Sequence, residues 1–129
     1  MRYVIDSYAW LEYFMGTEAG RRVKEIIDSE ADEKLTPSIC LAETYAKILK
    51  TEDEDKAELR REFIKSRSAL IPLDEDLAVA AAKTDIAMKK KVQGWGLADS
   101  IVLSTARDRN GKVVTGDSHF RGLTEAHMV

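Results

Sequence analysis

The chain has 129 residues, a formal net charge of −3 and a hydrophobic content of 44%, which fit a single domain over residues 1–129 with one sizeable core. A lone cysteine excludes an internal disulfide, and with only two histidines beside it a structural zinc site is not expected. The start has no basic and long apolar signal segment, and no stretch approaches membrane-spanning length, so we expect a cytoplasmic protein with no membrane partner.

Short strand-like runs alternate with helical patterns in the first half of the chain, without repeats or linkers. The expected elements are, in order, strand 3–6, helix 9–15, helix 18–29, strand 34–37 and helix 39–50. Gly16 is a suitable helix end, and Pro37 closes the second strand. Ser38 is expected to cap the helix that follows it.

The second half continues the same alternation. Its expected elements are a turn and helix start at 51–55 with the helix running to 67, strand 69–73, a helix capped by Asp74 and running to 90, helix 97–108, strand 112–115 and an edge strand 127–129. Helical connections between consecutive strands require right-handed crossovers and therefore a parallel sheet. The sequence predicts an α/β fold with a four- to five-stranded parallel sheet flanked by helices.

Two acidic residues come directly after expected strands. Asp6 follows the apolar run 3–5, and Asp117 follows the run 113–116. In a parallel sheet the carboxyl ends of the strands meet at one edge, where open α/β sheets bind their ligands. We therefore expect Asp6 and Asp117 to face one crevice.

Two further acids, Glu43 and Asp99, lie about one turn inside expected helices and can point into that crevice. Apolar residues such as Val102 and Leu103 lie at helical spacing from Asp99, so its carboxylate projects from an apolar stripe. The only cation at helical spacing from Glu43 is Lys47, and such a pair is weak. Because clustered buried carboxylates are costly without a cation, we predict bound Mg²⁺ or Mn²⁺, which prefer oxygen ligands.

Each candidate residue also has a purely structural interpretation. Asp6 could cap the helix that follows it, and Asp117 could stabilise a turn. Neither Glu43 nor Asp99 is expected to be a cap, so the burial of these two residues is the critical expectation. His119 is interpreted as a loop residue or a minor substrate contact.

The net charge of −3 argues at first against a nucleic-acid partner. Metal binding by four carboxylates would turn that count into +1 and make the site locally positive, as phosphate binding requires. Arg121 follows Asp117 by only four residues and is the candidate phosphate contact. The run 89–91 of three lysines is interpreted as a solvated helix end.

Four motifs in this order carry a resemblance to a known family. They are Val4-Ile5-Asp6-Ser7, a lone Glu43 in an early helix, Gly96-Leu97-Ala98-Asp99-Ser100 and Val114-Thr115-Gly116-Asp117. Together they cover the chain from end to end, and the chain resembles the PIN domain family, in particular the single-domain VapC-type toxins of toxin–antitoxin pairs. The resemblance implies a parallel sheet flanked by helices, an endoribonuclease activity that depends on Mg²⁺ or Mn²⁺, and a homodimer.

The resemblance also implies roles for individual residues. The family's four acids match Asp6, Glu43, Asp99 and Asp117. Thr115 matches the hydroxyl residue that supports the site, and Ser7 matches the small polar residue after the first acid. We assign Asp6 and Asp99 as the central metal ligands, and the other two acids to a peripheral or second-metal role.

The leading functional hypothesis is therefore a ribonuclease that hydrolyses RNA phosphodiester bonds and is neutralised by a small antitoxin protein. One alternative is a catalytically inactive PIN-like module that binds protein or RNA. Another is a phosphoryl-transfer enzyme with a nucleophilic aspartate after the first strand. A haloacid-dehalogenase-like phosphatase would need an acid two residues after Asp6, where this chain has Tyr8.

Overall fold

The computed structural model describes all residues from 1 to 129 and contains one five-stranded sheet. Its strands are β1 (Arg2–Ile5), β2 (Glu33–Pro37), β3 (Ala69–Ile71), β4 (Lys112–Thr115) and β5 (Ala126–Met128). Their order in the sheet is β3-β2-β1-β4-β5, and every neighbouring pair is parallel. The predicted α/β fold with a parallel sheet is confirmed, including the edge strand near the C-terminus.

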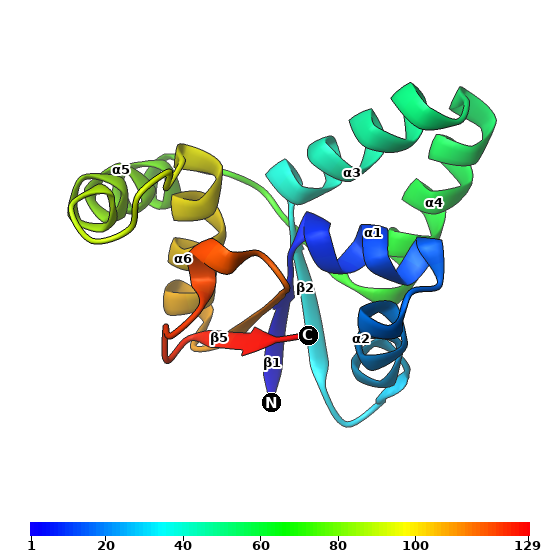
Figure 1. Cartoon of the computed structure of the whole chain (residues 1–129), viewed down its shortest axis with the longest axis horizontal. Coiled ribbons are helices and arrows are strands. Elements are labelled where there is room, and N and C mark those ends of the chain that lie inside the picture. The colour runs from blue at the N-terminus through cyan, green and yellow to red at the C-terminus, as the bar shows by residue number, and fades with distance from the viewer.

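Six α-helices and one short 3₁₀ helix connect the strands. They are α1 (Ser7–Met15), α2 (Glu18–Asp28), α3 (Ser38–Thr51), α4 (Glu54–Arg67), α5 (Glu75–Lys89), α6 (Leu97–Arg109) and the 3₁₀ helix η1 (Ser118–Phe120). Seen from the side in Figure 1, α1, α2 and α4 lie on one face of the sheet, and α5 and α6 lie on the other. None of these helices combines the length and the apolar character needed to cross a membrane.

Two buried clusters, one on each face of the sheet, hold these layers together. Successive residues of β1 point to opposite faces, so Val4 joins the cluster under α5 and α6 while Ile5 joins the cluster under α1, α2 and α4. Val113 and Val114 of β4 divide in the same way. Burial on both faces explains why consecutive residues are apolar in the middle of the sheet, at Val4-Ile5 in β1 and Val113-Val114 in β4.

The structure corrects several local expectations. Ser38 does not cap α3: Pro37 occupies the N-cap position and no side chain caps this helix. Strand β3 ends at Ile71 and does not reach residue 73, because Pro72 has no N–H to donate to a neighbouring strand. Asp74 caps α5 as predicted, with its carboxylate accepting from the Leu77 N–H at 2.8 Å. The 3₁₀ helix after Asp117 was not predicted.

Candidate functional site

Asp6 lies at the junction between β1 and α1, where it is the N-cap of the helix and is only 6% exposed. Its Oδ1 accepts from the Ser7 N–H at 2.8 Å and from the Cys40 thiol at 3.6 Å, and its Oδ2 accepts from the Thr115 hydroxyl at 2.8 Å. Thr115 is close because β4 pairs directly with β1. Asp6 therefore caps α1 and also lies in the crevice, as predicted.

Burial raises the pKa of Asp6 from 3.8 to about 6, although the hydrogen bonds from Thr115 and Ser7 favour its charged form. The nearby charge of Glu43 raises the pKa of Asp6 further. Burial also raises the pKa of the Cys40 thiol well above its usual range, so the thiol remains a protonated donor. The environment of Asp6 therefore disfavours its charged form unless a cation is bound.

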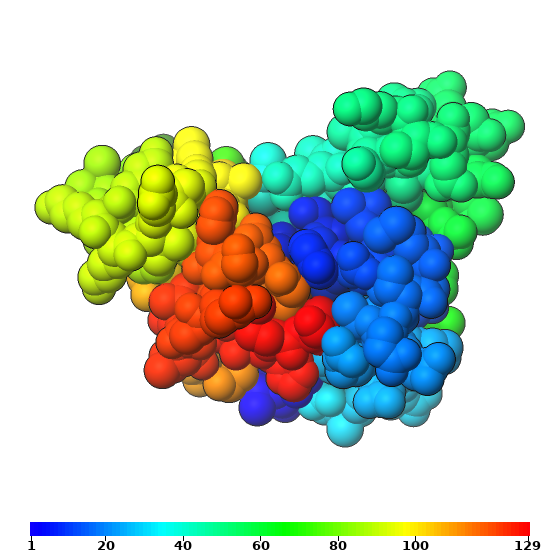
Figure 2. Space-filling view, in the orientation of Figure 1, coloured from blue at the N-terminus to red at the C-terminus, as the bar shows by residue number.

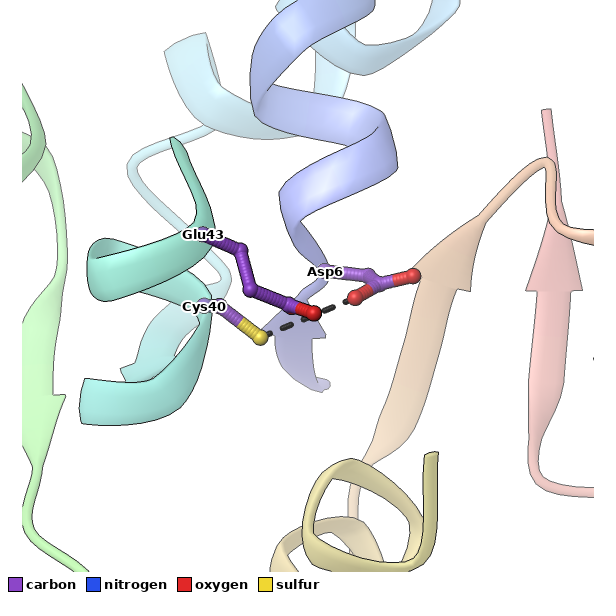
Figure 3. Close-up of side chains that lie close together, drawn as sticks. All are labelled: Asp6, Cys40 and Glu43. Carbon is purple, nitrogen blue, oxygen red and sulfur yellow. Dashed lines mark hydrogen bonds between the residues drawn. The ribbon is translucent and has the colours of Figure 1, made fainter. Parts of the chain in front are cut away.

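Glu43 lies one turn into α3 and turns its carboxylate toward Asp6, as Figure 3 shows. Its Oε1 accepts from the Ser7 hydroxyl at 3.0 Å. The expectation that Glu43 is buried was wrong: the residue is exposed, because this face of α3 borders an open cavity. Partial burial of the carboxylate still raises the pKa of Glu43.

Asp99 is the third residue of α6, and its side chain is 18% exposed. It packs beside an apolar stripe as predicted, since Val102 and Leu103 are buried. Gly96 holds the N-cap position, so Asp99 is not itself the N-cap, but Asp99 contributes to the capping from the third position of the helix. Since α6 begins at Leu97, the Oδ2 of Asp99 reaches back to accept from the Gly96 N–H at 3.0 Å.

A buried polar chain fixes the beginning of α6. The indole N–H of Trp95 donates to the Ser100 hydroxyl at 2.7 Å, and that hydroxyl donates to Asp85 of α5 at 2.9 Å. Lys89 pairs with the same carboxylate at 2.8 Å. Trp95 is therefore a buried anchor, and the turn that presents Asp99 is tied to the neighbouring helix.

Asp117 follows β4 and caps the 3₁₀ helix η1, with its Oδ1 accepting from the His119 N–H at 2.9 Å. Its own N–H donates to the Thr115 hydroxyl at 3.0 Å, so one hydroxyl contacts both Asp6 and Asp117. The residue between Thr115 and Asp117 has to be a glycine, because a Cβ at Gly116 would lie 2.3 Å from the ring of Tyr8. The close packing of this turn against the start of α1 is visible in Figure 2, where the orange and dark-blue segments touch.

All four predicted acids line one cavity with a volume of about 220 Å³. Its lining consists of Asp6, Ser7, Tyr8, Leu11, Glu43, Ala98, Asp99, Val102 and Asp117. Thr115 lies buried behind this lining and reaches it through Asp6. Arg121 is exposed and is not part of the lining, so its predicted contact with phosphate stays a prediction.

Sequence reasoning missed the contacts of two residues in this site. Cys40 precedes Glu43 by three positions and therefore shares its helix face, which could have indicated the contact with Asp6. His119 was assigned to a loop, yet its Nδ1 lies 2.9 Å from the Oδ2 of Asp99. That hydrogen bond raises the pKa of His119, and the charge of Asp117 adds to the effect.

The side chains form two groups whose members could hold a cation together. One contains Asp6, Cys40 and Glu43, and the other contains Asp99, Asp117 and His119; within each group the ligand atoms lie within 4.8 Å of one another. The acids supply hard oxygen ligands, which suit Mg²⁺ and Mn²⁺. The two groups line one cavity, so their carboxylates could hold divalent cations there.

Comparisons with known proteins identify the family and the fold of the chain. A family model described as PIN domain matches residues 3–125. A search of curated proteins finds no match. Among solved structures, VapBC2 from Rickettsia felis bound to a DNA fragment from its promoter is similar, with a TM-score of 0.76 and 15% identity over 100% of this chain and 98% of that chain.

Two other solved structures have the same fold. VapC20 from Mycobacterium tuberculosis, described as a Sarcin-Ricin loop cleaving toxin, has a TM-score of 0.77 and 13% identity over 95% of both chains. VapBC-1 from nontypeable Haemophilus influenzae has a TM-score of 0.75 and 17% identity, covering 100% of this chain and 97% of that chain. At these identities the likeness establishes the fold.

Proposed function

The chain belongs to the PIN domain family, and from that premise we propose that it is a metal-dependent endoribonuclease, the toxin of a VapBC-type toxin–antitoxin pair. The observation that carries the proposal is the convergence of four carboxylates, from four separate parts of the chain, on one cavity. The similarity to toxin structures, one of them described as a Sarcin-Ricin loop cleaving toxin, supports the proposal.

The acids would hold Mg²⁺ or Mn²⁺, with Asp6 and Asp99 as central ligands and Glu43 and Asp117 in a peripheral or second-metal role. Asp99 has one oxygen occupied by two hydrogen bonds, while its Oδ1 accepts none from the protein and is free for a cation. Ser7 and Thr115 would support the site by holding Glu43 and Asp6 in place.

Phosphodiester hydrolysis requires an activated water and stabilisation of negative charge. Bound divalent ions would supply both, because they lower the pKa of the water that they bind and stabilise negative charge on the leaving oxygen. The residues of this chain bind and orient the ions, and none of them has to act as the nucleophile. Without cations the clustered carboxylates repel a phosphate, so RNA binding at this cavity should itself depend on metal.

The partners form part of the same proposal. The expected partners are an RNA substrate, a small antitoxin protein and a second copy of this chain in a homodimer, within the cytoplasm. Solved structures with this fold include toxin–antitoxin complexes, one of them from Klebsiella pneumoniae. A small antitoxin gene beside the gene for this chain would support the pairing.

The decisive experiment is cleavage of a mixed RNA pool by the purified protein with Mn²⁺, Mg²⁺ or EDTA. The Asp6→Asn and Asp99→Asn variants are run beside it, with folding checked by circular dichroism. Metal-dependent cutting that both variants lose supports the proposal. Equal cutting by wild type and variants would identify a contaminant and reject the acidic site.

Metal binding without cleavage of any RNA would instead favour the inactive binding module. The phosphoryl-transfer alternative has no support from the family match. Tyr8, which stands two residues after Asp6, also packs its ring against the turn at Gly116 and offers no second acid.

A further inference from the structure

We propose that the imidazole of His119 is a positioning residue for the metal site, which holds Asp99 so that one carboxylate oxygen faces the cavity. The inference rests on the proposed metal site and adds a residue that lies outside the four acids. His119 itself does not line the cavity between those acids. Its role therefore follows from its contacts with two of them.

The two carboxylate oxygens of Asp99 differ in their hydrogen bonds. Oδ2 accepts from the Gly96 N–H at 3.0 Å and lies 2.9 Å from the Nδ1 of His119. Because an ionised carboxylate only accepts hydrogen bonds, Nδ1 carries the proton in this pair. Two donors on Oδ2 fix the plane of the carboxylate and leave Oδ1 for a cation.

His119 also forms a hydrogen bond to Asp117 through its backbone N–H. Its N–H donates to the Oδ1 of Asp117 at 2.9 Å, and its Nδ1 lies 3.8 Å from the same oxygen. One residue therefore contacts two acids that approach the cavity from different elements, α6 and the turn after β4. This links the positions of Asp99 and Asp117.

The imidazole of His119 also packs closely against the loop before α6. Gly94 has a φ of +83°, and a Cβ there would lie 3.1 Å from the Nε2 of His119. The ring of the buried Trp95 is also near, with its centroid 6.4 Å from that of His119. The loop that leads into α6 thus restricts the ring whose nitrogen holds Asp99.

The test compares the Mn²⁺ affinities of His119→Ala and His119→Asn with that of the wild type, measured by calorimetry without RNA. The alanine variant loses the donor, and we expect its affinity to fall about 10- to 100-fold, the usual cost of removing a residue that orients a ligand. Asparagine places its amide nitrogen as many bonds from Cβ as Nδ1, so we expect an affinity near wild type. Spin-echo spectroscopy of bound Mn²⁺ should show no directly coordinated nitrogen.

The matched control is His127→Ala, because His127 lies on β5 and packs its ring against Tyr3, with 5.7 Å between the ring centroids. This variant should bind Mn²⁺ like the wild type. Unchanged affinity in His119→Ala would overturn the inference. Equal losses in the alanine and asparagine variants, or a nitrogen coupled to Mn²⁺, would overturn it in favour of His119 as a direct ligand.

The failure of the proposed function would look different. Wild-type protein that binds Mn²⁺ but cuts no RNA would reject the nuclease and leave the role of His119 to be decided by the same affinities. Wild-type protein that binds no Mn²⁺ would overturn the metal site and the role of His119 together.

Discussion

The hydroxyl of Thr115 donates to the carboxylate of Asp6 at 2.8 Å, although 109 positions separate the two residues in the chain. The same hydroxyl accepts from the N–H of Asp117 at 3.0 Å. Both contacts follow from the pairing of β1 with β4, which places the ends of the two strands side by side. A single fully buried oxygen therefore aligns two of the four acids.

Thr115→Val tests this alignment, because valine keeps the shape and removes the hydroxyl. We expect the free energy of unfolding to fall by about 1–3 kcal/mol, since Asp6 loses a donor and the Asp117 N–H loses its acceptor. Mn²⁺ affinity should fall about 10- to 100-fold. Urea unfolding without metal and Mn²⁺ titration measure the two effects.

The control for this substitution is Thr105→Val. Thr105 is equally buried, but its hydroxyl donates only to the Ile101 carbonyl within α6, at 2.7 Å. Its replacement should leave Mn²⁺ affinity unchanged. An equal loss of affinity in both variants would show that Thr115 acts only through general stability.

Asp6→Asn should make the metal-free protein more stable near pH 8. The pKa of Asp6 is raised from 3.8 to about 6 by burial, so this group contributes most stability when protonated, and that contribution is lost as pH rises from 3.8 to about 6. Above that range the free energy of unfolding is lower by about 3 kcal/mol, because each unit of difference in pKa corresponds to about 1.36 kcal/mol. Asparagine keeps an acceptor oxygen for the Ser7 N–H and removes the charge.

The measurement is urea unfolding of wild type and Asp6→Asn at pH 4 and pH 8, in EDTA. The variant's advantage should be present at pH 8 and much smaller at pH 4. A variant that is less stable than wild type at pH 8 would contradict the interpretation that the buried charge destabilises the metal-free state.

Bound metal should raise the free energy of unfolding, and the gain should grow with the ratio of metal concentration to Kd. Mn²⁺ at 100 times its Kd would add about 2.7 kcal/mol to the free energy of unfolding, and EDTA should remove that gain. Asp99→Asn should lose most of the gain and Asp117→Asn less, because Asp99 is assigned as a central ligand and Asp117 as a peripheral one. Melting curves at several Mn²⁺ concentrations report the difference, and the reverse ranking would exchange the two roles.

Ser100→Ala tests the polar chain behind Asp99. It leaves the buried indole N–H of Trp95 without an acceptor, so the free energy of unfolding should fall by about 1–3 kcal/mol. Metal affinity should fall too, because the beginning of α6 is no longer tied to Asp85. Ser104→Ala is the comparison, since it breaks a bond to Thr84 of α5 one turn further from the site. If both variants bind Mn²⁺ equally, the chain has no role in placing Asp99.

Much of the fold and the convergence of the acids could be predicted from the sequence. The alternation of strands and helices determines a parallel sheet, and a parallel sheet brings residues that follow its strands, such as Asp6 and Asp117, to one edge. Periodicity also placed Glu43 and Asp99 near that edge. The structure brings all four to one cavity, while their role as metal ligands stays a prediction.

Details that depend on distant packing could not be read from local patterns. The exposure of Glu43 depends on the open cavity beside α3, which helix periodicity does not describe. The contact between His119 and Asp99 depends on the path of the chain through η1 and on the space left by Gly94. The start of α6 at residue 97 was predicted, but helix spacing does not show that the Asp99 side chain turns back to accept from the Gly96 N–H.

The separation between Asp6 and Thr115 also has a consequence for synthesis. Asp6 is translated 109 positions before Thr115, which contacts it in the folded chain. The cavity cannot close around its four acids before β4 pairs with β1. Under the proposed function, a nascent chain therefore has no complete site for RNA before β4 has been translated and has paired with β1.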